Sequence, residues 1–329
     1  QFFERSLRPA PLRHPMLQNN RTGIFLIIIG MTIFSIHDSL IKVLSTDISL
    51  IQLQFVRSLV GVLTIIVYLK LTHQPFVFRT GYPFLTVVRG LLSFFGYSAF
   101  YLAQSKMPIA NISVLFLTSP FFITIISIYF FDSRVGWRRW LAMVIGFCGV
   151  IIICSPEGGK LNLYYVIPVL VAVAYALSVI LAKKTADKDT LYQTIVFQYL
   201  IAGSISVVLG LAFGDGRFDN EKYSEIEFVV RAWSLDDPTI ILSLVGLSIV
   251  GVAGFGLLLQ AYRIADPAVV SPYEYSFLIW MILWGYLFWG DIPSVSEAAG
   301  MLLIVGAGVY MFYREQVRNQ ELAIDTTLR

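Results

Sequence analysis

Charged residues are scarce in this 329-residue chain, where Asp, Glu, Lys and Arg together make up 14% of the sequence. Hydrophobic residues make up 57%, and the mean hydropathy is +0.74. An ordinary soluble domain has about 25% charged residues and about 45–50% apolar ones. The shortage of charge therefore excludes an ordinary soluble domain and indicates a chain that lies in a lipid bilayer.

Histidine and cysteine are also scarce, with three and two residues. No cluster of these residues has the spacing of a metal site, so we expect neither a metal centre nor any other cofactor. Cys148 and Cys154 lie six positions apart in one apolar run, which places them about 240° apart around a helix. A disulfide between them is therefore not expected, and we interpret both as packing residues.

No phosphate-binding loop is present. The turn SPEGGK, from Ser155 to Lys160, is followed by Leu161, so it lacks the Gly-x-x-x-x-Gly-Lys-Ser/Thr order that holds phosphate and magnesium. This excludes ATP-driven chemistry of that type, and the loops are too short to hold an enzyme domain. The net charge of +3 reflects membrane orientation, and no nucleic-acid partner is expected.

Long apolar runs dominate what is present. A membrane span needs about 20 consecutive apolar residues in a helix. The sequence predicts ten such spans, at 22–44, 49–69, 82–103, 109–130, 137–154, 164–184, 191–213, 239–261, 268–289 and 294–313. The fold class that we predict is an all-α integral membrane protein.

The positions of Lys and Arg predict the orientation. With the N-terminus inside, sixteen of the 24 basic residues lie in cytoplasmic segments, five lie on the opposite face and three lie within spans. Both termini, 1–21 and 314–329, are therefore expected to be cytoplasmic tails. The first run is too long for a signal peptide and has no cleavage site after a short core, so we expect it to remain as the first helix, in a bacterial inner (plasma) membrane.

The two halves of the chain share ordered matches. Lys42 corresponds to Lys183 at an offset of 141, and Ala110 corresponds to Ala268 at an offset of 158. The long acidic loop from Gly214 to Pro238 explains the change of offset. We therefore predict two repeats, 22–154 and 164–313, joined by a linker at 155–163. Because each repeat has five spans, the second must be inverted, as in many secondary transporters.

Five segments of the chain resemble the drug/metabolite transporter superfamily, and specifically its EamA-domain type. They are DSLIK at Asp38–Lys42, FVRSL at Phe55–Leu59, RGLLSFFGY at Arg89–Tyr97, AYRIADPAVVSPYEY at Ala261–Tyr275, and the last-helix segment LLIVGAGVY. The resemblance covers about 22–313. It implies a ten-helix secondary transporter with two five-helix repeats. The first-half segments are similar to the branch associated with organic-anion and S-adenosylmethionine carriers.

Four charged residues lie deep in predicted spans, where an unpaired charge costs at least about 2.5 to 3.5 kcal/mol. Asp38 and Arg57 lie about 9 Å and about 12 Å from the outer ends of their spans, and Arg89 and Glu274 share the inner leaflet. The sequence thus permits two charge pairs, Asp38 with Arg57 and Arg89 with Glu274. They are either substrate contacts or gates around a central cavity, or permanent structural ion pairs.

His37 neighbours Asp38 but points about 100° away around the helix, so the two need not share a surface. It either relays protons or is a buried hydrogen-bonded residue. Lys42 lies near the outer end of its span, where we expect a structural role. Pro120, Pro168 and Pro272 can break or bend their helices, either to expose backbone groups to a cavity or as packing kinks.

Polar and aromatic side chains around these charges suit a small organic solute. The remaining candidates for substrate binding or gating are Ser93, Tyr97, Tyr101, Asn111, Tyr175, Ser178, Ser271 and Tyr275. Our leading hypothesis is a secondary transporter that moves a small charged or zwitterionic metabolite, such as an amino acid, an amino-acid derivative or an organic anion, by alternating access. Its partners would be the substrate and membrane lipid, with proton coupling left open, and it would be a monomer or weak homodimer. The alternative hypothesis is an intramembrane enzyme that uses His37 and Asp38 as acid and base.

Overall fold

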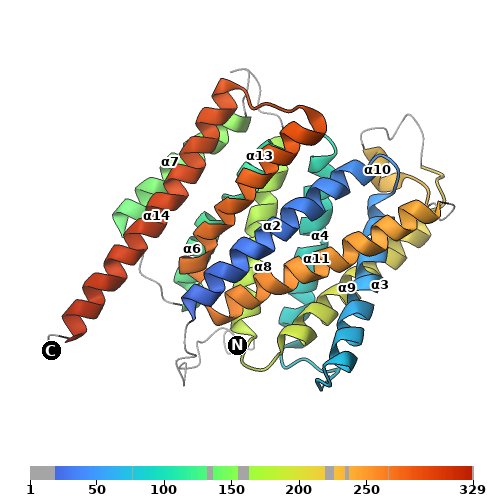
Figure 1. Ribbon diagram of the computed structural model, residues 1–329, viewed down its shortest axis with the longest axis horizontal. Helices are drawn as coiled ribbons and strands as arrows, with labels where there is room; N and C mark the ends of the chain where they lie inside the picture. Colours follow the sequence, from blue (N-terminus) through green and yellow to red (C-terminus); the bar gives the residue numbers. More distant parts are fainter. Residues whose placement is uncertain are drawn as a thin grey trace, which may run out of the picture.

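The computed structural model describes residues 19–75, 77–131, 136–154, 163–218, 226–233, 237–265 and 267–327. Within these ranges the protein is helical and has no strands. Helices of the first half are α2 (Asn20–Leu44), α3 (Leu50–Leu71), α4 (Pro83–Gln104), α5 (Ile109–Phe116), α6 (Ser119–Phe131) and α7 (Trp137–Cys154). Figure 1 shows them interleaved with the helices of the second half.

The second half begins with the 3₁₀ turn η1 (Leu163–Tyr165). It continues with α8 (Val166–Lys184), α9 (Leu191–Phe213), the short α10 (Glu227–Val230) and α11 (Pro238–Ile264). It ends with α12 (Pro267–Val270), the 3₁₀ turn η3 (Ser271–Tyr275), α13 (Ser276–Trp289) and α14 (Val295–Thr327). Each of the ten predicted spans thus coincides with a helix or with a helix that is broken in the middle. The fold is that of an all-α membrane protein.

Short polar signals set several helix ends. The Asn19 side chain accepts a hydrogen bond from the Thr22 backbone nitrogen at 3.2 Å, which caps α2. Thr190 and Gln193 form a capping box at the start of α9. Gly290 follows α13 in the left-handed conformation, with φ of 68°, a conformation that glycine adopts at little cost. These signals fix the starts of α2 and α9 and the end of α13.

Packing between the helices follows the predicted repeat. The first helix of each repeat packs on the third helix of the other, as in the pairs α2 with α11 and α8 with α4. The second helix of each repeat likewise contacts the third helix of the other, as in α3 with α11 and α9 with α4. Two further large interfaces, α3 with α9 and α7 with α14, join equivalent helices of the two halves. The pair α7 and α14 lies at one side of the bundle in Figure 1. The fold therefore consists of two five-helix repeats, and the odd number of spans inverts the second relative to the first.

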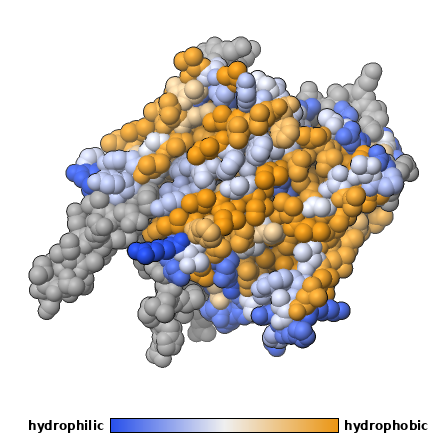
Figure 2. Space-filling view, in the orientation of Figure 1, coloured by the Kyte–Doolittle hydropathy of each residue, from blue (hydrophilic) through white to orange (hydrophobic). Residues whose placement is uncertain are grey.

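Apolar side chains cover the outside of the bundle as well as its core. Figure 2 shows hydrophobic residues over most of the visible face, while polar ones gather along its lower edge. Leu211 on α9 and Leu242 on α11 are 80% and 72% exposed. Seven of the described helical segments are long and apolar enough to cross a membrane, with shorter apolar helices at Trp140–Cys154 and Val295–Met311. These surfaces face lipid.

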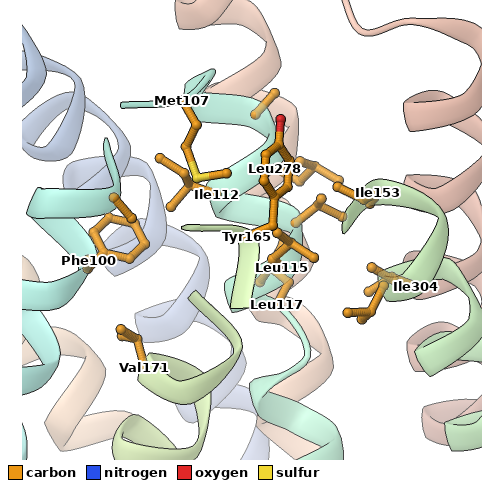
Figure 3. Close-up of a cluster of buried hydrophobic side chains, with 14 of the residues drawn as sticks. Phe100, Met107, Ile112, Leu115, Leu117, Ile153, Tyr165, Val171, Leu278 and Ile304 are labelled. Carbon is orange, nitrogen blue, oxygen red and sulfur yellow. The ribbon is translucent and has the colours of Figure 1, made fainter. Parts of the chain in front are cut away.

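Two clusters of buried apolar side chains hold the helices together. Figure 3 shows part of the first, in which Ile112 and Leu115 from α5 lie near Ile153 from α7 and Ile304 from α14. All four side chains are completely buried. The second cluster joins α2, α8, α9 and α11. The cavity described below lies among the helices that these clusters position.

Candidate functional site

Two broken helices meet near the centre of the bundle. The fourth span of the first repeat is interrupted between α5 and α6, and the fourth span of the second repeat is interrupted by η3. Each break carries a Ser-Pro pair, Ser119–Pro120 and Ser271–Pro272, and proline removes a helix hydrogen bond. The Ser119 hydroxyl donates to Glu274 Oε2 at 3.3 Å, so the two breaks touch. Paired discontinuous helices are typical of transporter binding sites.

Glu274 is completely buried and is held by hydroxyl groups. Its Oε1 accepts a 2.6 Å hydrogen bond from the Tyr175 hydroxyl on α8 and another from the Tyr262 hydroxyl on α11. Together with Ser119, three uncharged donors surround the carboxylate. No Lys, Arg or His forms an ion pair with it among the residues that the structure describes.

The expected pair of Arg89 with Glu274 is therefore wrong. Arg89 points to α9, where it donates to Gln198 Oε1 at 2.7 Å and to the Thr194 carbonyl at 3.1 Å. Equal depth in the membrane placed Arg89 and Glu274 in the same leaflet. Depth does not say which neighbouring helix a side chain faces, because that depends on how each helix is rotated about its axis.

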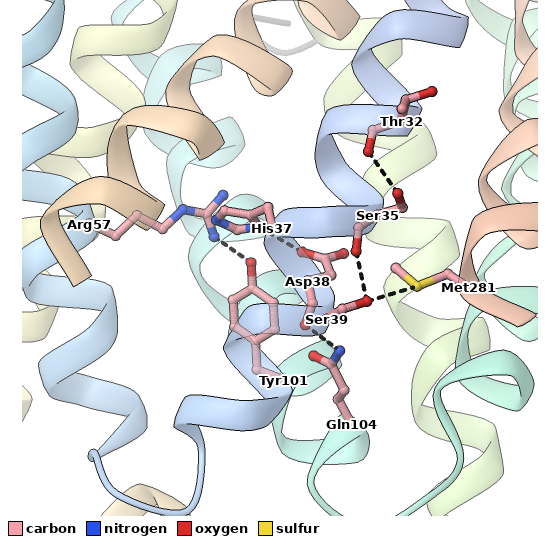
Figure 4. Close-up of polar contacts among 9 residues, drawn as sticks. All are labelled: Thr32, Ser35, His37, Asp38, Ser39, Arg57, Tyr101, Gln104 and Met281. Atoms are coloured by element: carbon pink, nitrogen blue, oxygen red, sulfur yellow. Dashed lines mark hydrogen bonds and ion pairs between the residues drawn. The ribbon is translucent and has the colours of Figure 1, made fainter. Parts of the chain in front are cut away.

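The expected pair of Asp38 with Arg57 is also not formed. Asp38 Oδ1 lies 2.8 Å from the His37 ring nitrogen Nδ1, and no salt bridge joins Asp38 to Arg57 in the described part of the chain. Arg57 instead donates to the Tyr101 hydroxyl at 2.6 Å and lies 4.4 Å from the centroid of the Tyr97 ring. Figure 4 shows the contact of Asp38 with His37 and that of Arg57 with Tyr101. The positive charge is thus held by hydroxyl and ring contacts.

His37 shares a surface with Asp38 after all, because the imidazole turns back to the neighbouring carboxylate. The ring is completely buried and packs against α11, where a Cβ added at Gly251 would lie 2.6 Å from its Nε2 atom. The backbone carbonyl of Asp38 accepts a 2.8 Å hydrogen bond from Gln104 on α4. These contacts fix the direction in which the Asp38 carboxylate points.

A cavity of about 850 Å³ lies between α2, α4, α8 and α11. Five of the expected site residues line it: Asp38, Ser93, Tyr97, Tyr175 and Ser178. Much of the wall is apolar and aromatic, from Phe34, Phe100, Phe116, Phe255 and Phe277. Asp38 is the only carboxylate among the described lining residues. The cavity thus presents one negative charge within a largely apolar wall.

A smaller chamber of about 270 Å³ adjoins this cavity, with Ser93 and Tyr97 lining both. Arg57 lines the smaller chamber, whereas its hydrogen-bond partner Tyr101 does not. Glu274 lies just beyond the wall of the larger cavity, where it contacts the lining residues Tyr175 and Tyr262. The structure therefore gathers most of the expected residues around two neighbouring spaces.

Three expected residues lie away from both spaces. Asn111 donates to the Glu297 side chain of α14, and so joins α5 to α14. Tyr275 packs so closely on α14 that a Cβ at Gly308 would overlap its ring. Ser271 is buried at the start of η3. We assign these three to helix packing.

Sequence reasoning missed several lining residues. Tyr262 and Phe255 on α11 line the larger cavity, as do Leu258 and Leu259. A signal for two of them was present, because Gly251, Phe255 and Tyr262 recur at positions that share one face of a helix. In the structure Gly251 packs against His37 of α2, whereas the rings of Phe255 and Tyr262 lie against Tyr199 and Tyr175.

Comparison with known proteins supports the architecture. The EamA-like transporter family matches residues 21–155 and again 162–314. The chain is 24% identical over 306 residues to an S-adenosylmethionine uptake transporter of Rickettsia bellii, covering 91% of this chain and 96% of that one. It is 25% identical over 289 residues to the pseudopaline exporter CntI of Pseudomonas aeruginosa, covering 87% and 94%.

Further comparisons agree. A riboflavin transporter of Rhizobium johnstonii is 29% identical over 245 residues, covering 74% of this chain and 75% of that one. A solved structure described only as a crystal structure of a protein superposes with a TM-score of 0.62 at 18% identity, covering 88% and 95%, which supports the fold. These relatives are transporters and not enzymes, so the alternative of an intramembrane enzyme is set aside. The chain belongs to the EamA-like transporter family, whose members named here move small metabolites across membranes.

Proposed function

We propose that this protein is a secondary transporter of a small charged or zwitterionic metabolite, an amino acid or a derivative of one, that carries an amine or another cationic group on an apolar body. The observation that carries the proposal is the position of Asp38, the one carboxylate on the described wall of the 850 Å³ cavity. A largely apolar wall with a few polar groups is typical of sites that bind small organic molecules. We place the protein in a bacterial inner membrane with both termini cytoplasmic.

The electrostatics favour a cationic group at Asp38. Carboxylates in a medium of low dielectric constant attract an opposite charge far more strongly than they do in water. The aromatic rings of Phe34, Phe100 and Phe116 nearby offer apolar contact and a face toward which a cation is attracted. A substrate with an amine next to an apolar body satisfies both features. The relatives named for S-adenosylmethionine, pseudopaline and riboflavin transport support a metabolite carrier.

Alternating access follows from the two inverted repeats. The break in α5–α6 and the break at η3 meet at the contact between Ser119 and Glu274, where a small movement of one repeat against the other changes both walls of the cavity. Glu274 is buried among hydroxyl donors without a charged partner. It is therefore our candidate for carrying a proton during the cycle, which makes proton coupling part of the proposal.

The test is solute flux into proteoliposomes that contain the purified full chain. Candidate amino acids, amines and carboxylates are offered singly and in competition. Asp38→Asn removes the charge but keeps the shape, and we expect at least about tenfold weaker apparent affinity for cationic solutes, since an interaction with a charged group contributes about 1.5–3 kcal/mol. Asp47→Asn, in the exposed turn after α2, is the matched control. Unchanged affinity in Asp38→Asn would overturn the assignment, and absence of flux for every solute would overturn the carrier itself.

A further inference from the structure

Seven of the nine residues that line the smaller chamber carry a polar group, and the other two are Phe94 and Ala202. It lies between α3, α4 and α9, and its walls include Gln54, Arg57 and Ser58 of α3 and Gln198 and Tyr199 of α9. Each of these five side chains except Tyr199 is at most 4% exposed, and Tyr199 is 5% exposed. The larger cavity, in contrast, has mostly aromatic and aliphatic walls. Two neighbouring spaces of such different character are expected to take different parts of one molecule.

Positive charge around the chamber has no direct salt-bridge partner in the described part of the chain. Arg57 lines it, and Arg89 lies behind its Gln198 wall. Neither arginine forms a salt bridge with a carboxylate among the residues that the structure describes. The Nε atoms of both are buried without a hydrogen-bond partner. Two buried cations without an anion are costly inside a membrane, so an anion bound here would stabilise the site.

Hydrogen-bond donors converge on the same space. The Tyr199 hydroxyl is buried and has no partner, and the Arg57 Nε–H group is likewise unpaired. Arg89 donates to Gln198 Oε1 at 2.7 Å, and arginine has no acceptor, so this contact fixes the orientation of the Gln198 amide. Its nitrogen is then the atom left to donate to a ligand. The chamber therefore offers donors and a positive charge, and it has no acidic residue on its described wall.

We propose that this chamber is an anion-binding subsite that takes the carboxylate of the transported metabolite. The inference rests on the proposed function, and it specifies the substrate as a zwitterion whose amine lies at Asp38 while its carboxylate lies at Arg57. The chamber is much smaller than the adjoining cavity, so it suits one end of a metabolite better than a whole one. Ser93 and Tyr97, which line both spaces, would lie beside the bond that joins the two ends of the substrate.

The geometry distinguishes this role from a purely structural one. Arg57 already has contacts that hold its side chain in place, namely the Tyr101 hydroxyl at 2.6 Å and the Tyr97 ring. These contacts leave the Nε–H group unused. A structural arginine in a membrane ordinarily uses its donors on protein groups, because each unused donor costs free energy. Arg57 and Tyr199 both line the chamber, and each holds a buried donor that has no hydrogen-bond partner among the described residues, which points to a ligand.

The test compares four probes by their effect on the unfolding temperature of the full chain purified in detergent, in a buffer free of other small anions. L-phenylalanine has the apolar body, the amine and the carboxylate, and L-phenylalaninamide lacks only the carboxylate. Sodium acetate supplies a carboxylate alone, and sodium chloride supplies an inorganic anion. We expect phenylalanine to bind at least about tenfold more tightly than its amide, and acetate to compete with phenylalanine.

One variant separates ligand binding from folding. Tyr199→Phe removes only the unpaired hydroxyl and keeps the ring that packs on Gly61, so the fold should be unaffected. We expect about fivefold weaker binding of phenylalanine and acetate, with binding of the amide unchanged. The matched control is Tyr286→Phe on α13, whose side chain is 57% exposed to the lipid side.

The outcomes are distinguishable from failure of the proposed function. Equal binding of phenylalanine and its amide to the wild-type chain, or no binding of either, would overturn the subsite even if cationic solutes are transported. Chloride that binds as tightly as acetate and competes with it would overturn the carboxylate assignment. Loss of carboxylate binding in Tyr199→Phe with retention in Tyr286→Phe supports it. Absence of all transport with intact acetate binding would instead remove the carrier proposal and leave the anion site.

Discussion

Lys42 and Lys183 make the same hydrogen bond in the two halves of the chain. Lys42 donates from Nζ to the Met107 carbonyl at 3.0 Å, and Lys183 donates to the Ala265 carbonyl at 2.6 Å. Each lysine lies in the last turn of the first helix of its repeat. Each carbonyl lies in the turn before the broken fourth helix. The internal sequence match of Lys42 with Lys183 therefore corresponds to an equivalent contact in three dimensions.

These two hydrogen bonds hold the start of each broken helix in place. A hydrogen bond from a charged donor contributes about 1.5–3 kcal/mol, so we expect Lys42→Met and Lys183→Met each to lower the free energy of unfolding by about 1–2 kcal/mol. Lys70→Met, at the exposed end of α3, is the control and should change little. Chemical unfolding of the protein in detergent measures all three. A Lys42→Met variant as stable as Lys70→Met would show that the hydrogen bond from Lys42 to Met107 does not stabilise the fold.

The order and extent of the helices could be predicted from the sequence because they depend on local properties. A run of about 20 apolar residues has few alternatives in a membrane other than a helix, and all ten spans were found on that basis. The breaks in the fourth and ninth spans were foreshadowed by Pro120 and Pro272, whose effect on a helix is also local. The domain boundaries at 22–154 and 164–313 lie close to the two family matches, at 21–155 and 162–314.

The partners of the buried charges could not be predicted in the same way. Depth follows from counting residues along one helix, whereas the partner depends on the rotation and packing of several helices. Arg89 donates to Gln198 on α9 and not to Glu274. Glu274 accepts a hydrogen bond from Tyr262, which lies twelve residues earlier on α11 and was not recognised as a candidate. Tyrosine and serine partners of a buried carboxylate cannot be found by a search of the sequence for residues of opposite charge.

The contact between Gly251 and His37 can be tested with a single methyl group. A Cβ at position 251 would lie 2.6 Å from His37 Nε2, so Gly251→Ala must displace the ring or the helix. We expect about 1–3 kcal/mol of destabilisation from overpacking and slower solute flux, because the ring holds the Asp38 carboxylate. Gly246→Ala on the same helix has no atom within 4 Å of the added carbon, and it should leave flux unchanged. Equal flux in the two variants would separate His37 from the transport cycle.

Proton coupling through Glu274 predicts a specific pattern of transport. Glu274→Gln keeps the shape and most hydrogen bonds but cannot release a proton. We expect accumulation driven by an imposed pH gradient to be lost, while exchange of labelled for unlabelled solute at equal pH is retained. Glu227→Gln, outside the spans on α10, is the acidic control. If Glu274→Gln still accumulates solute in response to a pH gradient, the proton is carried elsewhere.

Arg231 fastens α10 to the turn between α2 and α3. Its Nη1 atom donates to the carbonyls of Ser45 at 2.9 Å and Ile48 at 3.2 Å, and its Nη2 atom forms a 2.6 Å salt bridge with Glu227. The carbonyl contacts join segments that are far apart in sequence. The salt bridge joins two residues only four positions apart, and the Glu227 side chain is about half exposed. We therefore expect the carbonyl contacts to contribute more to stability than the salt bridge.

Two variants and a pH series separate these contributions. Arg231→Ala removes both kinds of contact and should cost about 1–2 kcal/mol, while Glu227→Gln removes only the exposed pair and should cost about 0.5 kcal/mol or less.

The hydrogen bond from Arg231 lowers the pKa of Glu227 below its ordinary value of 4.5. Because the folded-state pKa is the lower one, the contribution of the pair is fully present above the ordinary pKa and is lost as the pH falls through the folded-state pKa. Unfolding measured in detergent from pH 7 downward should therefore show a small constant difference between wild type and Glu227→Gln that disappears in acid, while the larger deficit of Arg231→Ala persists. A deficit of Arg231→Ala that disappears together with that of Glu227→Gln would mean that the salt bridge, and not the contacts with Ser45 and Ile48, holds α10 in place.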